Sequence, residues 1–121
     1  MKILAVDDDE VILTFINCIL KMDSHEVVNA HCFDEALSVM EDNKFDMVIT
    51  DIVMPGKDGT ELMKHIRSEG YTMPIVAITG GIENASEDYL NYANLFSDRS
   101  LSKPFHQSEL LETVHRLDKA A

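Results

Sequence analysis

The sequence predicts an α/β fold in which a doubly wound, five-stranded parallel sheet is covered by helices on both faces. Short aliphatic runs alternate along the chain with stretches whose apolar residues recur every three or four positions. The run 45–50 is apolar on both parities apart from Asp46, which is typical of a strand that is covered on both faces. With 121 residues, we expect a single domain, residues 1–121, that has its own hydrophobic core.

The first third of the chain is expected to contain two strands, each followed by a helix. Residues 3–6 are a short aliphatic strand, and the acidic stretch 7–10 leads into a helix with apolar residues at helical spacing over 12–20. Residues 26–30 are a second, shorter strand candidate, and the apolar spacing of 33–40 predicts the helix that follows it.

The middle of the chain contains the strand on which the prediction depends. The apolar run 45–50 stops at Asp51, and the turn dipeptides Pro55-Gly56 and Asp58-Gly59 take the chain out of the sheet. The next helix has Leu62, Met63 and Ile66 facing inward, and Gly70 is expected to form its C-terminal cap.

The last two strand and helix pairs are less regular. Residues 74–78 form a strand with proline at its first position, and 82–93 are weakly amphipathic and expected to be helical. Residues 99–102 are mostly polar, as in an edge strand, and 110–117 predict a final helix. Strands that alternate with helices imply a parallel sheet with right-handed crossovers.

Composition narrows the possible functions. The net charge is −12 and no segment gathers a basic patch, which argues against direct binding to nucleic acid. Cys18 and Cys32 lack metal-ligand spacing, so we expect free, reduced thiols.

We also expect no signal peptide, no membrane span and a cytoplasmic location. The five histidines share no ligand spacing and receive no role, and five methionines are expected in the core: Met22, Met40, Met47, Met54 and Met63.

Polar residues follow four of the five expected strands. If the strand order is 2-1-3-4-5, the carboxyl edge of the sheet collects Asp7, Asp8, Asp51, Thr79 and Lys103. The first and third strands would then be neighbours about 4.8 Å apart, so Asp8 and Asp51 could reach one cation. Lys103 would start roughly 10 Å away, a gap that its side chain can largely close.

Three clustered carboxylates either bind a cation or lose ionisation. Two or three carboxylates and one carbonyl, with solvent or substrate oxygens for the remaining positions, favour Mg²⁺ over Ca²⁺, which needs more protein ligands. The nominal charges of three aspartates, Lys103 and Mg²⁺ sum to zero, so the site can accept a phosphoryl group. A carboxylate nucleophile beside a metal, a hydroxyl donor and an ammonium group is suited to phosphoryl transfer.

The segments VDDD, VITDIVMPGKDG, AITG and SKPF, in this order and spacing, resemble the response-regulator receiver domain over the whole chain. The resemblance implies a flavodoxin-like sheet of order 2-1-3-4-5 and phosphorylation of Asp51 by a phosphohistidine of a sensor histidine kinase or a histidine phosphotransfer protein. It also implies that the domain assists its own phosphorylation and dephosphorylation.

The resemblance further assigns the site residues. Asp8, Asp51 and the backbone carbonyl of Val53 would ligate Mg²⁺, and Asp7 would act through water. Thr79 and Lys103 would contact the phosphoryl oxygens, and the Lys103–Pro104 bond would be cis.

The sequence departs from the family at three places. Ser100 stands where receivers usually carry the aromatic residue that swings inward on phosphorylation, which places that switch in doubt. Gly80-Gly81 predicts an unusually loose loop after Thr79, and Phe96-Ser97 replaces a common Gly-Ala. We therefore expect output through rearrangement of this loop, on the face formed by the helix 82–93, the strand 99–102 and the last helix.

Other interpretations remain open. The acidic stretch 7–10 alone would also suit a helix N-terminus. Asp7 and Asp9 after a strand imitate a haloacid-dehalogenase-like phosphatase with Asp7 as nucleophile, although Asp51 then has no role. The receiver fold could also serve as a phosphate-independent interaction module.

A docking patch for the phosphodonor is a further expectation. Ile12 and Phe15, with Pro104 and Phe105, could form an apolar surface beside the crevice for a histidine-bearing helix bundle. Ile12 and Phe15 could equally belong to the core.

Overall fold

The computed structural model describes residues 1–54, 56–79, 91–92 and 94–120. Five parallel strands form one sheet in the order β2-β1-β3-β4-β5, which confirms the predicted fold class and strand order. The strands are β1 (Lys2–Val6), β2 (Glu26–Ala30), β3 (Met47–Asp51), β4 (Ile75–Ile78) and β5 (Arg99–Leu101). The helices with described bounds are α1 (Glu10–Met22), α2 (Phe33–Asp42), α3 (Gly59–Ser68) and α5 (Gln107–Ala120).

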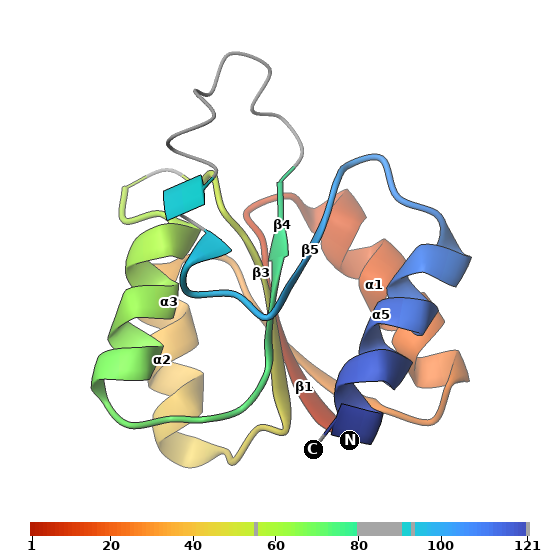
Figure 1. Cartoon of the computed structure of the whole chain (residues 1–121), viewed down its shortest axis with the longest axis horizontal. Helices are drawn as coiled ribbons and strands as arrows, with labels where there is room; N and C mark the ends of the chain where they lie inside the picture. The colour runs from red at the N-terminus through yellow and green to blue at the C-terminus, as the bar shows by residue number, and fades with distance from the viewer. Residues whose placement is uncertain (55, 80–90, 93, 121) are drawn as a thin grey trace.

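Helices cover both faces of the sheet. Alternate residues of β1 point to opposite faces, so Ile3 and Ala5 pack with α1 and α5, whereas Leu4 and Val6 pack with α2 and α3. Figure 1 shows these two helical layers on either side of the strands. Because β1, β3 and β4 are buried between the layers, the carboxyl ends of these strands are held in fixed relative positions.

Side-chain caps fix where α1 and α3 begin. The Asp9 side chain accepts a hydrogen bond from the Val11 N–H, and Asp58 does the same for the Glu61 N–H at 3.1 Å. Both caps follow a strand of the sheet directly or after a short turn. Each therefore sets the path by which the chain leaves the carboxyl edge.

Several predicted details need correction. Met22 is 78% exposed because it lies in the last, outward-facing position of α1, so its assignment to the core was wrong. The other four methionines assigned to the core are buried. β3 is shifted relative to the predicted run 45–50 and includes Asp51. α3 ends at Ser68, and Gly70 follows with φ of 88°, so it caps the helix from just beyond its end as expected.

Two residues before β5 have structural roles that the sequence did not reveal. Phe96 packs against the core on the α2 and α3 side, and its ring lies edge-on to Tyr92 with 5.5 Å between centroids. Asp98 accepts hydrogen bonds from the Ile75 N–H at 2.8 Å and from Arg67 at 3.0 Å. Asp98 thereby ties the start of β4 to α3 and to the edge strand.

Other expectations can be compared with the described residues. The Lys103–Pro104 bond is cis and both cysteines are free, as expected. Most of the helix expected over 82–93, and Gly80-Gly81, lie outside the described residues. No helix in the described ranges has both the length and the apolar character needed to cross a membrane.

Candidate functional site

Asp51 is the last residue of the central strand β3. It pairs in register with Ile78 of β4, and its side chain is almost fully buried, with 4% of the residue exposed. This burial is unusual for an aspartate, because a carboxylate loses hydration when it leaves water. The strand end therefore fixes a charged group in a position that is costly unless other groups compensate it.

Gly59 packs directly behind this strand end. A Cβ atom at Gly59 would lie 1.9 Å from the Asp51 carbonyl oxygen and 2.9 Å from the Ile52 Cα, both of which are backbone atoms. The Gly59 N–H also donates to the Ile52 carbonyl at 2.8 Å. The sequence showed Gly59 only as part of a turn, and its eight-residue distance from Asp51 gave no sign of this contact. Here glycine is needed for close backbone approach.

Two further aspartates lie beside Asp51. The Asp7, Asp8 and Asp51 carboxylates each place an oxygen within 4.8 Å of the others, as the predicted strand order requires. Asp7 is fully buried, and one of its oxygens accepts a hydrogen bond from the Asp9 N–H at 2.9 Å; Asp8 is exposed. The cluster is therefore half inside the protein and half open to solvent.

Lys103 supplies the opposite charge. Its Nζ lies 3.1 Å from Asp7 Oδ2 and 3.3 Å from Asp51 Oδ2, so one ammonium group bridges both buried carboxylates. The contact with Asp7 is close in distance but not well directed, since Asp7 Oδ2 forms no hydrogen bond among the described residues. Burial works to lower the pKa of Lys103, but the two carboxylates raise it overall, so the lysine stays charged.

Thr79 lies at the same edge, one residue beyond the partner of Asp51. Its N–H donates to the Leu101 carbonyl at 2.8 Å, and its hydroxyl lies 3.3 Å from that carbonyl and from Ser102 Oγ. The hydroxyl is thus directed toward β5 in this structure. Ser100 is exposed on β5, paired with Ala77.

The surroundings of Asp51 disfavour the charged form of its carboxyl group. The pKa of Asp51 is raised from the ordinary 3.8 to about 6, first by burial and then by the negative charge of Asp7. Lys103 and the Val53 N–H act in the opposite direction and do not cancel these effects. An ionised Asp51 is consequently short of positive charge around it.

The donor set suits a hard divalent cation. Asp51 Oδ1 and Asp7 Oδ2 are buried and form no hydrogen bond among the described residues, and Asp8 adds an accessible carboxylate. Mg²⁺ prefers such oxygen ligands and retains several waters, which the open side of the cluster permits. The structure thus fits the Mg²⁺ that the sequence predicted.

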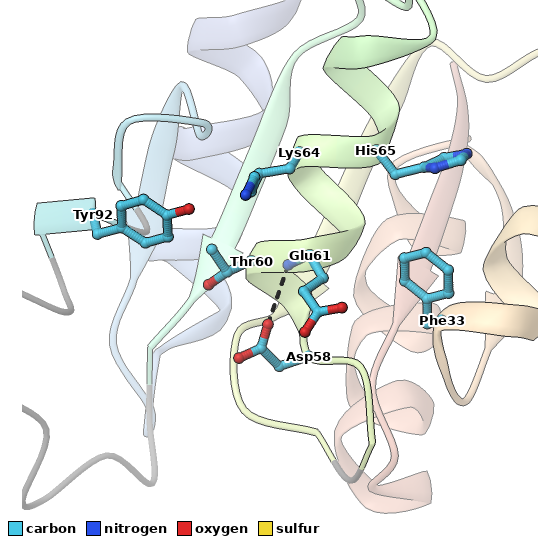
Figure 2. Close-up of a pocket in the computed structure, with 7 residues that line it drawn as sticks. All are labelled: Phe33, Asp58, Thr60, Glu61, Lys64, His65 and Tyr92. Atoms are coloured by element: carbon cyan, nitrogen blue, oxygen red, sulfur yellow. Dashed lines mark hydrogen bonds between the residues drawn. The ribbon is translucent and has the colours of Figure 1, made fainter.

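A separate hollow of about 520 Å³ lies on the α3 surface (Figure 2). It is lined by residues including Phe33, Glu61, Lys64 and Tyr92, and none of the three clustered aspartates is among them. Figure 2 shows Asp58 at the start of α3 with its capping bond to the Glu61 N–H. The hollow is therefore distinct from the carboxylate cluster.

Two of the expected docking residues, Phe15 and Phe105, are in contact. Phe15 is 39% exposed, and its ring centroid lies 5.7 Å from that of Phe105, which is mostly buried. Ile12 is partly buried against the core of the α1 and α5 side. Ile12 therefore has a packing role, whereas Phe15 presents apolar surface to solvent.

Comparisons with known proteins agree with this geometry. The family model for the response regulator receiver domain matches residues 3–115. The chain is 34% identical over 113 residues to the nisin biosynthesis regulatory protein NisR of Lactococcus lactis, covering 93% of this chain and 48% of that protein. It is 33% identical over 109 residues to the alkaline phosphatase synthesis transcriptional regulatory protein PhoP of Bacillus subtilis, covering 90% of this chain and 45% of that protein. The chain thus spans about half the length of these curated relatives.

Among solved structures, the response regulator protein TrrA of Thermotoga maritima, in complex with Mg²⁺ and BeF, is 31% identical with a TM-score of 0.83. The match covers 96% of this chain and 97% of that one. The acidic cluster of this chain is typical of the Mg²⁺ site of receivers and is consistent with a phosphoacceptor. From the family match, the sheet order and the clustered aspartates, we conclude that the chain belongs to the response regulator receiver domain family.

Proposed function

We propose that the chain receives a phosphoryl group on Asp51 from a phosphohistidine of a sensor histidine kinase or a histidine phosphotransfer protein. The observation that carries this proposal is the buried Asp51 carboxylate, which has one oxygen without a hydrogen bond among the described residues and shares the Lys103 ammonium group with Asp7. Family membership implies a two-component histidine kinase as the partner class. We further propose that the chain acts as a relay, a phosphate sink or a diffusible regulator.

The transfer forms one bond and breaks another. A carboxylate oxygen of Asp51 attacks phosphorus, the bond between phosphorus and the donor imidazole nitrogen breaks, and the electron pair returns to the imidazole. The product is an acyl phosphate. Lys103 is placed to follow the negative charge as it moves from the carboxylate to the phosphoryl oxygens, because it already contacts Asp51 Oδ2.

Mg²⁺ held by Asp8, Asp51 and the Val53 carbonyl, with Asp7 acting through water, would supply positive charge to the phosphoryl oxygens. Burial of Asp7 keeps its carboxylate fixed on the inner side of the cluster. Thr79 would turn its hydroxyl from Leu101 toward a phosphoryl oxygen, a change that breaks contacts of 3.3 Å.

The output surface is proposed to lie on the face of the helix expected over 82–93, β5 and α5. Ser100 has no aromatic ring to move between buried and exposed positions, so a change after Thr79 would carry the signal. The alternative phosphatase assignment finds little support, since Asp9, its general acid, is engaged as the N-cap of α1.

The test is to phosphorylate the purified chain with a small phosphodonor and Mg²⁺ and to map the acyl phosphate by mass spectrometry after reductive trapping. We expect the label on Asp51, its loss in Asp51→Asn and its retention in Asp42→Asn, a change at an exposed aspartate. Label on Asp7 would support the phosphatase, and no label in a folded protein would support a phosphate-independent module.

The docking patch can be tested in the same assay. Phe15→Ser removes an exposed ring and should slow transfer from a cognate phosphohistidine protein, while labelling by the small donor stays unchanged. A loss of both activities, or a large loss of stability, would show that Phe15 serves the core instead.

A further inference from the structure

The turn that ends α1 adopts a strained conformation. The His25 N–H donates to the Leu20 carbonyl at 3.0 Å and the Ser24 N–H to the Lys21 carbonyl at 3.1 Å, which is the pattern of a Schellman motif. Ser24 occupies the left-handed position with φ of 68°, where glycine is usual and another residue costs about 1–2 kcal/mol. The turn brings Asp23 and His25 together, with His25 Nε2 2.9 Å from Asp23 Oδ2.

A third side chain reaches the same oxygen from the other end of the chain. His115 of α5 places its Nε2 2.7 Å from Asp23 Oδ2, although 92 residues separate them. One donor atom from each of Asp23, His25 and His115 lies within 4.8 Å of the other two. His25 Nδ1 lies 3.0 Å from the Met1 amino group, so Nε2 is the ring nitrogen that faces Asp23.

We propose that Asp23, His25 and His115 form a binding site for a divalent transition metal of the Zn²⁺ class. Two imidazole nitrogens and one carboxylate oxygen are a ligand set that Zn²⁺ accepts with water in the fourth position. Imidazole ligands do not suit Mg²⁺, which prefers oxygen. The site is therefore chemically different from the carboxylate cluster around Asp51.

The geometry needs only a small adjustment. Tetrahedral Zn²⁺ with bonds of about 2.0–2.1 Å holds its ligand atoms roughly 3.3 Å apart. The present nitrogen-to-oxygen distances of 2.7 and 2.9 Å must therefore open by about half an ångström. The side chain of His115 is 50% exposed and that of Asp23 30% exposed, so both can move, while the His25 side chain, 9% exposed, provides the fixed ligand.

The site lies at the end of the sheet opposite to the phosphoryl crevice. His25 immediately precedes β2 and Met1 precedes β1, whereas Asp7 and Asp51 follow the carboxyl ends of their strands. A bound metal would fasten α5 to the turn between α1 and β2. Because the unfolded chain does not hold these ligands together, binding should raise the stability of the folded domain.

The experiment is a calorimetric titration of the tag-free, metal-stripped protein with ZnCl₂ in excess Mg²⁺, which occupies the carboxylate cluster. We expect one tight equivalent of Zn²⁺ and a Zn²⁺-dependent rise in the thermal midpoint. His115→Gln, at an exposed position, should weaken binding at least about tenfold, equivalent to about 1.4 kcal/mol, and reduce the rise in the thermal midpoint accordingly. Co²⁺ should give the visible absorption bands of a four-coordinate site and lose them on addition of Zn²⁺.

His65→Gln is the matched control, because His65 also lies beside a carboxylate, 4.0 Å from Glu69, on the surface of α3. It should bind Zn²⁺ like the unaltered chain. Equal binding by His115→Gln, loss of binding in Cys18→Ser instead, or an absence of the tight equivalent would overturn the proposal. In the last case the three residues form a hydrogen-bonded contact only.

Discussion

Replacing Asp51 by asparagine should stabilise the metal-free protein at neutral pH, although it removes the proposed phosphoacceptor. The pKa of Asp51 rises from 3.8 in the unfolded reference to about 6 in the folded protein because of burial and the charge of Asp7. The contribution of Asp51 to the stability of the folded protein is therefore fully present below pH 3.8 and is lost as the pH rises through about 6. A shift of roughly two units corresponds to about 3 kcal/mol above that range. Asparagine has nearly the same shape and cannot ionise.

The pKa of about 6 already includes the attraction of Lys103, so about 3 kcal/mol is an upper limit that an asparagine reaches only if it is accommodated as well as a neutral carboxyl group. We expect a gain of about 1–3 kcal/mol in the free energy of unfolding above pH 6, falling toward zero near 3.8. Urea unfolding in EDTA, repeated across this pH range, measures the difference in the free energy of unfolding between the variant and wild type. Asp42→Asn is the control, and its difference from wild type should show no comparable dependence on pH. Mg²⁺ should reduce the stability difference between Asp51→Asn and wild type, since it stabilises the ionised wild-type site.

The result that would refute this reasoning is an Asp51→Asn variant that is less stable than wild type at neutral pH. A difference that does not change with pH would refute it equally. Either outcome would mean that Lys103 already compensates the buried charge, and the unpartnered oxygens would then no longer argue for a cation.

Two further predictions concern the support of the site. Gly59→Ala should lower stability by about 1–3 kcal/mol and strongly reduce phosphorylation, because the new methyl group displaces the carboxyl end of β3. Gly70→Ala is the control: it should cost about 1–2 kcal/mol of stability, because Gly70 has a left-handed backbone, but it should leave phosphorylation unchanged. Equal phosphorylation of the two variants would contradict a role for the close approach of Gly59 to the Asp51 backbone. Asp98→Ala leaves the Ile75 N–H without its partner and should cost about 1–3 kcal/mol in urea unfolding. Arg67→Met removes the ion pair with Asp98 and the hydrogen bond to the Tyr71 carbonyl but leaves the Ile75 N–H paired, so it should cost less stability than Asp98→Ala. A loss equal to or larger than that of Asp98→Ala would contradict this account.

The strand order was predicted only through the resemblance to the receiver family. Given that order, local patterns placed the clustered aspartates, since parallel strands end at one edge and acidic residues stand at the carboxyl ends of β1 and β3. Contacts between distant segments were not predictable in this way. The approach of Gly59 to Asp51 depends on how α3 packs, and His25 and His115 meet only because α5 lies against α1. Met22 was misassigned because spacing alone does not show where a helix passes beyond the core.

The arrangement also indicates where a response to phosphorylation should occur. Asp51 cannot move easily, because β3 is paired on both sides and the backbone at Gly59 packs directly behind it. Thr79 and Lys103 lie on the β5 side, where the edge strand has only three residues and one neighbour. A new charge on a fixed residue is most easily accommodated by its less constrained neighbours. We therefore expect the structural change to start on the β4 and β5 side of the crevice, through contacts that Thr79 now makes with Leu101 and Ser102.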